Sequence, residues 1–316
     1  MLLSFSVENF RSFRTEQTFN LLASRRLGEC VSPHCCEVPG TGEHAIRIAS
    51  LYGANGAGKS NLVRAIALVD RLVRTGTAPG KQIPYKPFLL DDECSRKPTS
   101  FELQFVEGGE VFRYGFCYDA DRVHEEWLSV YHGQKEKEVF TRLTNEDGRV
   151  DVSLGPTATE RVGVSQKIKA LAQVGARPNQ LFLTEVVNLY DPDAQGPRFQ
   201  AVVRWFSSTL TATEADTPFG LPIQTIATND AFTEFAGGFL HEAGTGISGL
   251  EVQTRPLATS DILPSETVKK LVHDKMEGSI LILPGPEGEE LIVDASQRDM
   301  FAVRGIAALH DRAEGR

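Results

Sequence analysis

The chain has 316 residues, with 33 basic and 42 acidic side chains and a formal net charge of −9 at pH 7. Apolar residues make up 41% and charged residues 24%, as in an ordinary globular protein of one large or two modest domains. No run of ~18 apolar residues predicts a membrane span, and the N-terminus lacks the order of regions in a secretion signal, so we expect a cytoplasmic protein. The acidic balance excludes a surface that attracts nucleic acid everywhere, although it allows a local basic face.

Two short strands and a loop are predicted at the start of the chain. Apolar and polar residues alternate over 3–7 and again over 18–22, which predicts two strands joined by a connection over 9–13. Residues 25–44 are rich in turn-forming residues and predict a surface loop. This loop gathers Cys30, His34, Cys35, Cys36 and His44. Five cysteines without a CxxC pair favour free thiols, and a zinc site is the alternative.

The stretch LYGANGAGKSN, at 51–61, contains the pattern G-x-x-x-x-G-K-[ST] of a phosphate-binding loop. Upstream, the apolar and β-branched run over 45–53 predicts a buried strand that stops at the loop. Downstream, residues 61–76 have apolar positions at helical spacing and end at a glycine, which predicts a helix. Strand, glycine loop and helix therefore follow in the order that a phosphate loop requires.

The residue types of this loop suit Mg·ATP. Glycine lets the backbone adopt positive φ and approach an anion, and successive amides together with the start of a helix can surround phosphate oxygens. Lys59 is predicted to reach the β- and γ-phosphates, and Ser60 to ligate Mg²⁺. The alternative is a glycine-rich turn with an incidental Lys-Ser pair.

The rest of the chain changes character several times. Residues 75–98 look like a long connection, and alternating segments over 99–142 predict four antiparallel strands with hairpin turns. Helical segments follow over 164–241, and short strands return after 246. We therefore expect a nucleotide-binding lobe with an antiparallel subdomain over 1–160, a helical insertion over 161–245 and a β-rich return segment over 246–316.

Three stretches carry a family resemblance: FSVENFRSF at the start, YGANGAGKSNL, and FELQF with the later YGF and VHEEWL. They resemble the RecF/SMC-like ABC ATPases of the OLD-type branch, a family of ATP-binding proteins in phage defence and abortive infection. The resemblance runs over most of the chain, and its one specific motif is the phosphate loop. It implies an α/β P-loop NTPase core of the ABC-type ATPase head, with an antiparallel β subdomain and a helical insertion.

The resemblance also implies roles for residues outside the pattern. Arg11 and Ser12 would lie beside the nucleotide, Asn55 and Asn61 would line the loop, and Gln180 would sense Mg²⁺. Arg11 as a solvated turn residue and Gln180 as a polar residue at a helix start are the alternatives. The residues expected at the nucleotide are Arg11, Ser12, Gly53, Asn55, Gly56, Ala57, Gly58, Lys59, Ser60 and Asn61.

Two catalytic elements of such ATPases have only weak candidates, so whether the chain is an ATPase by itself stays open. GISGLE, at 246–251, resembles a signature segment but continues into an alternating, strand-like run. ELIVDAS ends an apolar strand with Asp294, yet Ala295 stands where the family has a catalytic Glu. We expect both to be ordinary strands. The chain is then either the N-terminal part of a longer ATPase or a short form completed in trans.

The resemblance implies an ATP·Mg-binding subunit that, once complete, closes as a homodimer of heads around two nucleotides. Its expected setting is anti-phage defence, where it would control a toxic effector protein such as a nuclease. The alternatives are a nucleotide-dependent scaffold without turnover and a RecF-like DNA-repair ATPase that binds nucleic acid.

Overall fold

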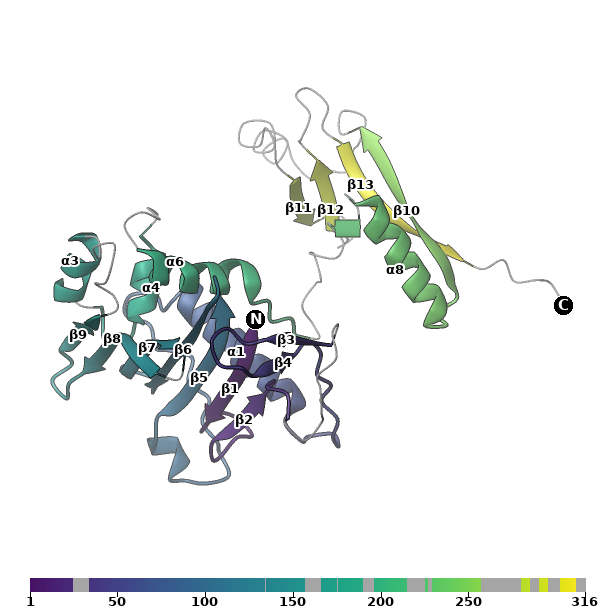
Figure 1. Cartoon of the computed structure of the whole chain (residues 1–316). Coiled ribbons are helices and arrows are strands. Elements are labelled where there is room, and N and C mark those ends of the chain that lie inside the picture. Colours follow the sequence, from purple (N-terminus) through teal and green to yellow (C-terminus); the bar gives the residue numbers. More distant parts are fainter. Residues whose placement is uncertain are drawn as a thin grey trace. The chain divides into compact units, whose positions relative to one another are not determined.

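The computed structural model divides the chain into two compact units, Met1–Ala215 and Asp216–Arg316. Figure 1 shows the elements of both units. The structure describes residues 1–24, 34–133, 135–156, 166–174, 176–189, 196–214, 225–226, 229–256, 280–284, 290–294 and 302–310. The division differs from the expected one, because helices predicted as a single insertion over 161–245 belong partly to the first unit and partly to the second.

A seven-stranded sheet in the order β2-β1-β5-β6-β7-β8-β9 is the frame of the first unit. All of its neighbouring strands are antiparallel. The strands are β1 (Leu2–Glu8), β2 (Gln17–Asn20), β5 (Thr99–Glu107), β6 (Glu110–Tyr118), β7 (Val123–His132), β8 (Lys135–Thr144) and β9 (Val150–Leu154). The two strands at the N-terminus and the four hairpin strands over 99–142 are confirmed.

Local sequence explains these hairpins. Between β5 and β6, Gly108 and Gly109 have φ of 60° and 80°, the pair of positive values that a tight two-residue turn needs. The alternating pattern then directs large aromatic side chains of β6 to one face of the sheet: Phe112, Tyr114, Phe116 and Tyr118, all fully buried. The opposite face carries polar side chains such as Glu102 and Arg113, whose Oε2 and NH2 atoms lie 2.6 Å apart.

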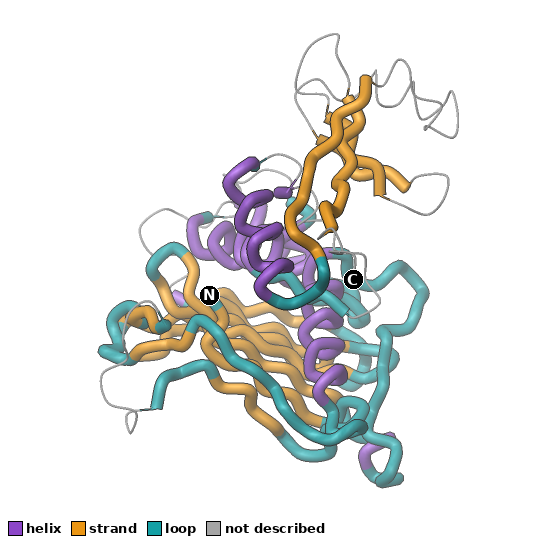
Figure 2. Tube along the Cα trace, turned by 90° about the vertical axis from the view of Figure 1, so that its right-hand side faces the viewer, coloured by secondary structure: helices purple, strands orange, loops and turns teal. Residues whose placement is uncertain are grey.

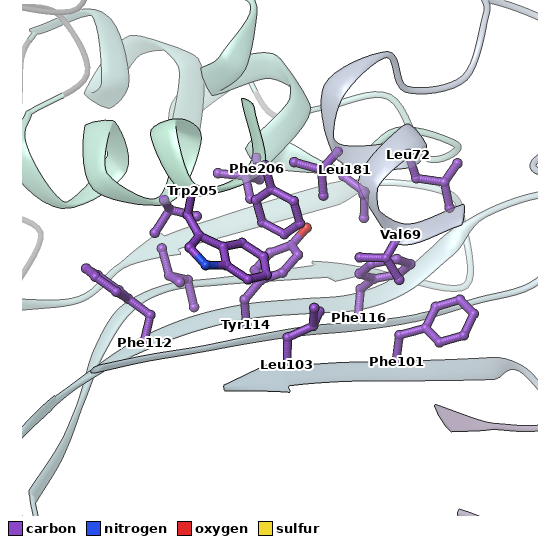
Figure 3. Close-up of a cluster of buried hydrophobic side chains, with 14 of the residues drawn as sticks. Val69, Leu72, Phe101, Leu103, Phe112, Tyr114, Phe116, Leu181, Trp205 and Phe206 are labelled. Atoms are coloured by element: carbon purple, nitrogen blue, oxygen red, sulfur yellow. The ribbon is translucent and has the colours of Figure 1, made fainter. Parts of the chain in front are cut away.

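Helices cover the aromatic face of the sheet (Figure 2). They are α1 (Lys59–Arg74), α3 (Gln166–Val174), α4 (Phe182–Val187), α6 (Pro197–Arg204) and the π-helical turn η3 (Trp205–Thr209). Figure 3 shows the core between the two layers, where Trp205 and Phe206 meet side chains of the sheet. The Trp205 ring stacks on Phe105 with centroids 4.0 Å apart. Val69 and Leu72 of α1 belong to the same buried core.

Helix α1 confirms the helix predicted after the phosphate loop. Leu62, Val69 and Val73 are buried, and Ile66 packs against the same core. The helix ends at Arg74, and Gly76 follows with φ of 70°. A left-handed glycine just after the last turn is a common helix terminator.

Two buried charged residues, Glu126 and Arg142, each join the sheet to the segment that follows α3. Both carboxylate oxygens of Glu126 accept hydrogen bonds at the start of α4, from the amides of Phe182 (2.6 Å) and Leu183 (3.0 Å). The Tyr114 hydroxyl donates a third bond to Glu126, at 3.0 Å. Arg142 donates to the carbonyl oxygens of Val123, Arg177 and Pro178. Burial raises the pKa of Glu126, although Arg142 and the amide donors act in the opposite direction.

The region upstream of the phosphate loop differs from both predictions made for it. Within the predicted surface loop, β3 (Cys35–Glu37) pairs with β4 (His44–Ile46) as a small hairpin. The buried strand predicted over 45–53 stops at Ile46, and residues 47–57 are all exposed. A strand needs neighbours for its backbone groups, and no described backbone–backbone hydrogen bond involves residues 48–53. The strand prediction was therefore wrong for residues 47–53, which belong to none of the described sheets.

The cysteine predictions have a mixed outcome. Cys36, Cys94 and Cys117 are free, as predicted, whereas Cys35 is disulfide-bonded, so the prediction was wrong there. Cys30, part of the zinc alternative, lies outside the described residues. Within the described ranges no group of three or more His, Cys, Asp or Glu residues could hold a metal ion.

In the second unit, helix α8 (Asp230–Glu242) packs on a four-stranded antiparallel sheet ordered β10-β13-β12-β11. The strands are β10 (Ile247–Pro256), β11 (Ile280–Pro284), β12 (Glu290–Asp294) and β13 (Ala302–His310). Asn229 caps α8 by accepting a hydrogen bond from the Phe232 amide at 3.0 Å. GISGLE runs into β10 and Asp294 ends β12, which is paired on both sides, so both segments are strands as predicted.

Among the helices of the described residues, none is both long enough and apolar enough to cross a bilayer.

Candidate nucleotide-binding site

The phosphate loop, Gly53 to Ser60, leads directly into α1 and leaves the start of that helix open. Gly58 is the N-cap residue, with φ of 95°, and no side chain of the described residues caps the helix. The amides of Gly58, Lys59 and Ser60 have no hydrogen-bond partner among the described residues. The first turn contains no acidic side chain, while Arg71 and Arg74 occupy the last turn. The positive end of the helix dipole and three free amides therefore remain available to an anion.

Glycine is required at two points of the loop. Gly56 and Gly58 have φ of 82° and 95°, a region that other residues rarely adopt. A Cβ at Gly58 would also lie 2.8 Å from the Ser12 Oγ. The loop can approach both a ligand and the turn that carries Ser12 because neither glycine has a side chain.

Lys59 lies over the loop that it follows. Its Nζ donates hydrogen bonds to the carbonyl oxygens of Gly53 at 2.6 Å and Ala54 at 2.9 Å. These bonds place the ammonium group at the phosphate loop, within reach of an anion bound there. A phosphate group could take over the same donors, since the lysine is a mobile point charge with three N–H groups.

The structure places Ser12 and Asn61 next to each other. The Asn61 Nδ2 donates to the Ser12 Oγ at 3.0 Å, across 49 residues of sequence. Asn61 also accepts a bond from Arg64 at 3.3 Å, and Arg64 forms an ion pair with Glu214 at 3.2 Å. Arg64 and Glu214 were missed by the sequence analysis. The spacing of Asn61 and Arg64 on one helix face was a usable signal, but nothing in the sequence connects Glu214 to them.

Arg11 belongs to the turn between β1 and β2, beside Ser12. Its φ of 50° is unusual for a residue other than glycine, and its amide donates to the Lys86 carbonyl oxygen at 2.8 Å. The guanidinium carbon lies 5.7 Å from the centre of the Phe10 ring, a cation–π distance. The side chain is exposed, so it is free to turn toward a ligand.

The remaining predicted residues form the exposed part of the loop. Asn55, Gly56, Ala57 and Ser60 are exposed, and Gly53 lies at the start of the loop. Ser60 is the first-turn hydroxyl that could ligate Mg²⁺, with phosphate oxygens and water as the other ligands. The free amides, the lysine and this hydroxyl fit a magnesium-bound polyphosphate by the chemistry of their donors.

Gln180 does not lie at the phosphate loop, which corrects the Mg²⁺-sensing role expected for it. It is buried at the other end of α1, where its Oε1 accepts a hydrogen bond from the Thr77 amide at 2.8 Å. Sixteen helical residues separate the two ends, about 24 Å at the rise of an α-helix. A Cβ at Gly76 would lie 2.4 Å from the Gln180 Nε2, so the amide fills the space that this glycine leaves. Gln180 therefore has a structural role, since it connects its own segment to the residues that follow α1.

Comparison with protein families matches part of the chain. Residues 48–160 are similar to a family described as "AAA domain, putative AbiEii toxin, Type IV TA system". The matched segment contains the phosphate loop, α1 and strands β5 to β9. No curated protein matches the chain. The match supports an ATPase of the AAA/P-loop kind in this segment and a mixed α/β fold.

Proposed function

We propose that the first unit binds Mg·ATP at the phosphate loop. The observation that carries the proposal is the open start of α1, where the successive amides of Gly58, Lys59 and Ser60 have no partner among the described residues and the Lys59 ammonium group lies over the same loop. Anions bind such helix starts because the amides and the dipole favour negative charge. The similarity of residues 48–160 to AAA domains supports a nucleotide rather than another anion.

We further propose that this nucleotide site controls a toxic effector in anti-phage defence, and that the protein acts as a homodimer of heads. The resemblance to RecF/SMC-like ATPases of the OLD-type branch supports this role. The description of the matched family names a putative toxin and a toxin–antitoxin system, which is compatible with an effector partner such as a nuclease. These steps rest on analogy between families, whereas the nucleotide site rests on its geometry.

Replacing Lys59 tests the site directly. Lys59→Ala removes the point charge expected at the β- and γ-phosphates, and no neutral side chain replaces it. We expect Mg·ATP affinity to fall by about tenfold or more, equal to about 1.4 kcal/mol, with the fold intact. Titration calorimetry measures the affinity, and circular dichroism measures the fold.

Lys169→Ala is the matched control, because Lys169 is an exposed helical lysine of the same unit. It should leave Mg·ATP affinity unchanged. Equal affinities for the Lys59→Ala variant and the unsubstituted chain would end the phosphate-loop proposal.

A nucleotide-dependent scaffold without turnover is the second candidate. The observation that favours it is the pairing of β10 and β12 within an antiparallel sheet, because these strands contain the candidate signature segment and Asp294. We expect the 316-residue chain to bind ATP, to release phosphate no faster than Lys59→Ala, and not to dimerise with ATP. Phosphate release at about 1 s⁻¹ or more, or ATP-dependent dimerisation in light scattering, would favour the enzyme.

A further inference from the structure

The long connection that follows α1 is attached to the turn that carries Arg11 and Ser12. Among the hydrogen bonds and ion pairs of the described residues, none joins residues 85–98, here called the clamp loop, to the phosphate loop. These residues contact the turn instead. The Arg11 amide donates to the Lys86 carbonyl oxygen, and Arg14 forms an ion pair with Asp91 at 2.5 Å.

Asn9 makes most of this attachment. Its side chain is 2% exposed, and its Nδ2 donates to the carbonyl oxygens of Cys94 at 2.8 Å and Lys97 at 2.7 Å. Its Oδ1 accepts a bond from the Phe88 amide at 3.1 Å. Asn9 thus bonds to residue 88 near the start of the clamp loop and to residues 94 and 97 near its end.

The backbone of Asn9 is constrained as well. Its φ is 49°, and its carbonyl oxygen accepts a bond from the Thr99 hydroxyl at 2.6 Å. Asparagine tolerates this left-handed conformation better than most residues, and here its amide also makes bonds that glycine cannot make. The turn therefore leaves β1 in a direction set by Asn9, two and three residues before Arg11 and Ser12.

We propose that Asn9 is a positioning residue that couples the clamp loop to the nucleotide state of the phosphate loop. Ser12 accepts a hydrogen bond from Asn61 and lies beside Gly58, where a Cβ would come within 2.8 Å of its Oγ, so phosphates that draw Lys59 and the amides of the helix start toward them also fix Ser12. When Ser12 is fixed, the turn that begins at Asn9 is fixed as well, and Asn9 then holds the clamp loop in place through its bonds to residues 88, 94 and 97. The inference rests on the proposed Mg·ATP site and adds a second segment that responds to it.

Hydrogen exchange of the full 316-residue chain, with and without Mg·ATP, tests the coupling. In the unsubstituted chain we expect slower exchange in two peptides, 47–62 at the phosphate loop and 85–98 in the clamp loop. The slowing at 85–98 should be about fivefold or more, the lower end of ordinary coupling between sites. Both should exchange as in the nucleotide-free chain when Lys59→Ala is tested with Mg·ATP.

Asn9→Gly isolates the side chain, because glycine adopts φ of 49° without strain. We expect this variant to keep the slowing at 47–62 and to lose it at 85–98. By reciprocity its Mg·ATP affinity should fall by about fivefold or more. A purely structural role would lower thermal stability and leave the response at 85–98 in place.

Asn179→Gly is the matched control. The Asn179 Nδ2 also donates to a carbonyl oxygen of the connection after α1, that of Lys81 at 2.8 Å, but it lies away from the turn. It should keep both responses.

Each outcome has a separate meaning. No slowing at 47–62 in the unsubstituted chain would overturn the proposed function. Slowing at 47–62 without slowing at 85–98 would overturn the coupling alone, and this arm needs no variant that must fold. Slowing at 85–98 that survives Asn9→Gly would overturn the role of Asn9.

Discussion

The two ends of helix α1 have the same local backbone feature in different surroundings. Each end has a glycine with positive φ, Gly58 at 95° and Gly76 at 70°. At the first end the segment before the helix is exposed, and Lys59 bonds only to the loop carbonyls among described groups. At the second end Gln180 fills the space over Gly76 and bonds to Thr77. A glycine turn is open to an anion where the tertiary structure leaves its amides free, and it is closed where the tertiary structure supplies a partner.

The surroundings of the second end explain why it is rigid. Glu126 and Arg142 hold residues 177–183 by hydrogen bonds from inside the core, so Gln180 has no freedom to follow a ligand. The surroundings of the first end are a turn and a loop joined by a few polar bonds. Stability should therefore depend on the second end and nucleotide affinity on the first.

Removing the carboxylate of Glu126 should have the largest effect on stability. Glu126→Ala leaves the amides of Phe182 and Leu183 and the Tyr114 hydroxyl buried without their acceptor, so we expect a loss of about 3 kcal/mol or more. Urea unfolding followed by tryptophan fluorescence measures it, and both tryptophans, Trp127 and Trp205, lie in the first unit. Glu136→Ala, at an exposed ion pair with Arg113, should cost about 1 kcal/mol or less. Equal losses would contradict the buried role.

Alanine at the two glycines compares the ends directly. Gly76→Ala adds a left-handed strain and a Cβ at 2.4 Å from Gln180, so stability should fall by about 2 kcal/mol or more while Mg·ATP affinity stays the same. Gly58→Ala should cost about 1 kcal/mol of stability, because its neighbours can move, yet it should lower Mg·ATP affinity by about tenfold or more. The same two measurements, unfolding and calorimetry, serve both variants. A loss of affinity with Gly76→Ala would show that the ends are coupled.

Ser12→Ala should have the smallest effect. The hydroxyl is exposed and bonds to Asn61, so stability should stay within about 0.5 kcal/mol. Mg·ATP affinity should fall by roughly fivefold, the effect of one lost hydrogen bond of about 1 kcal/mol. Ser6→Ala, at an exposed hydroxyl pair with Thr18 on the sheet, is the control and should bind normally. An unchanged affinity in Ser12→Ala would remove Ser12 from the site.

Much of the fold followed from local patterns. The alternation over 99–142 and the Gly108–Gly109 pair predicted the hairpins, because a period of two and two positive φ values are properties of neighbouring residues. The helix after the phosphate loop was also predictable from its apolar face and its final glycine. The strand predicted over 45–53 failed for a different reason: an apolar run states what a segment can bury, and the partners that would pair with it are not part of the pattern.

The sequence by itself determined the phosphate loop, since the two glycines, Lys59 and Ser60 are consecutive or nearly so and their chemistry is local. The tertiary structure alone decided which distant side chains reach that loop. It brings Ser12 to Asn61 across 49 residues and bonds Asn9 to Lys97 across 88, and it places Gln180 over the far end of α1. These contacts depend on how the sheet and the helix pack, and long-range packing is a sum of many weak interactions that no short stretch of sequence contains.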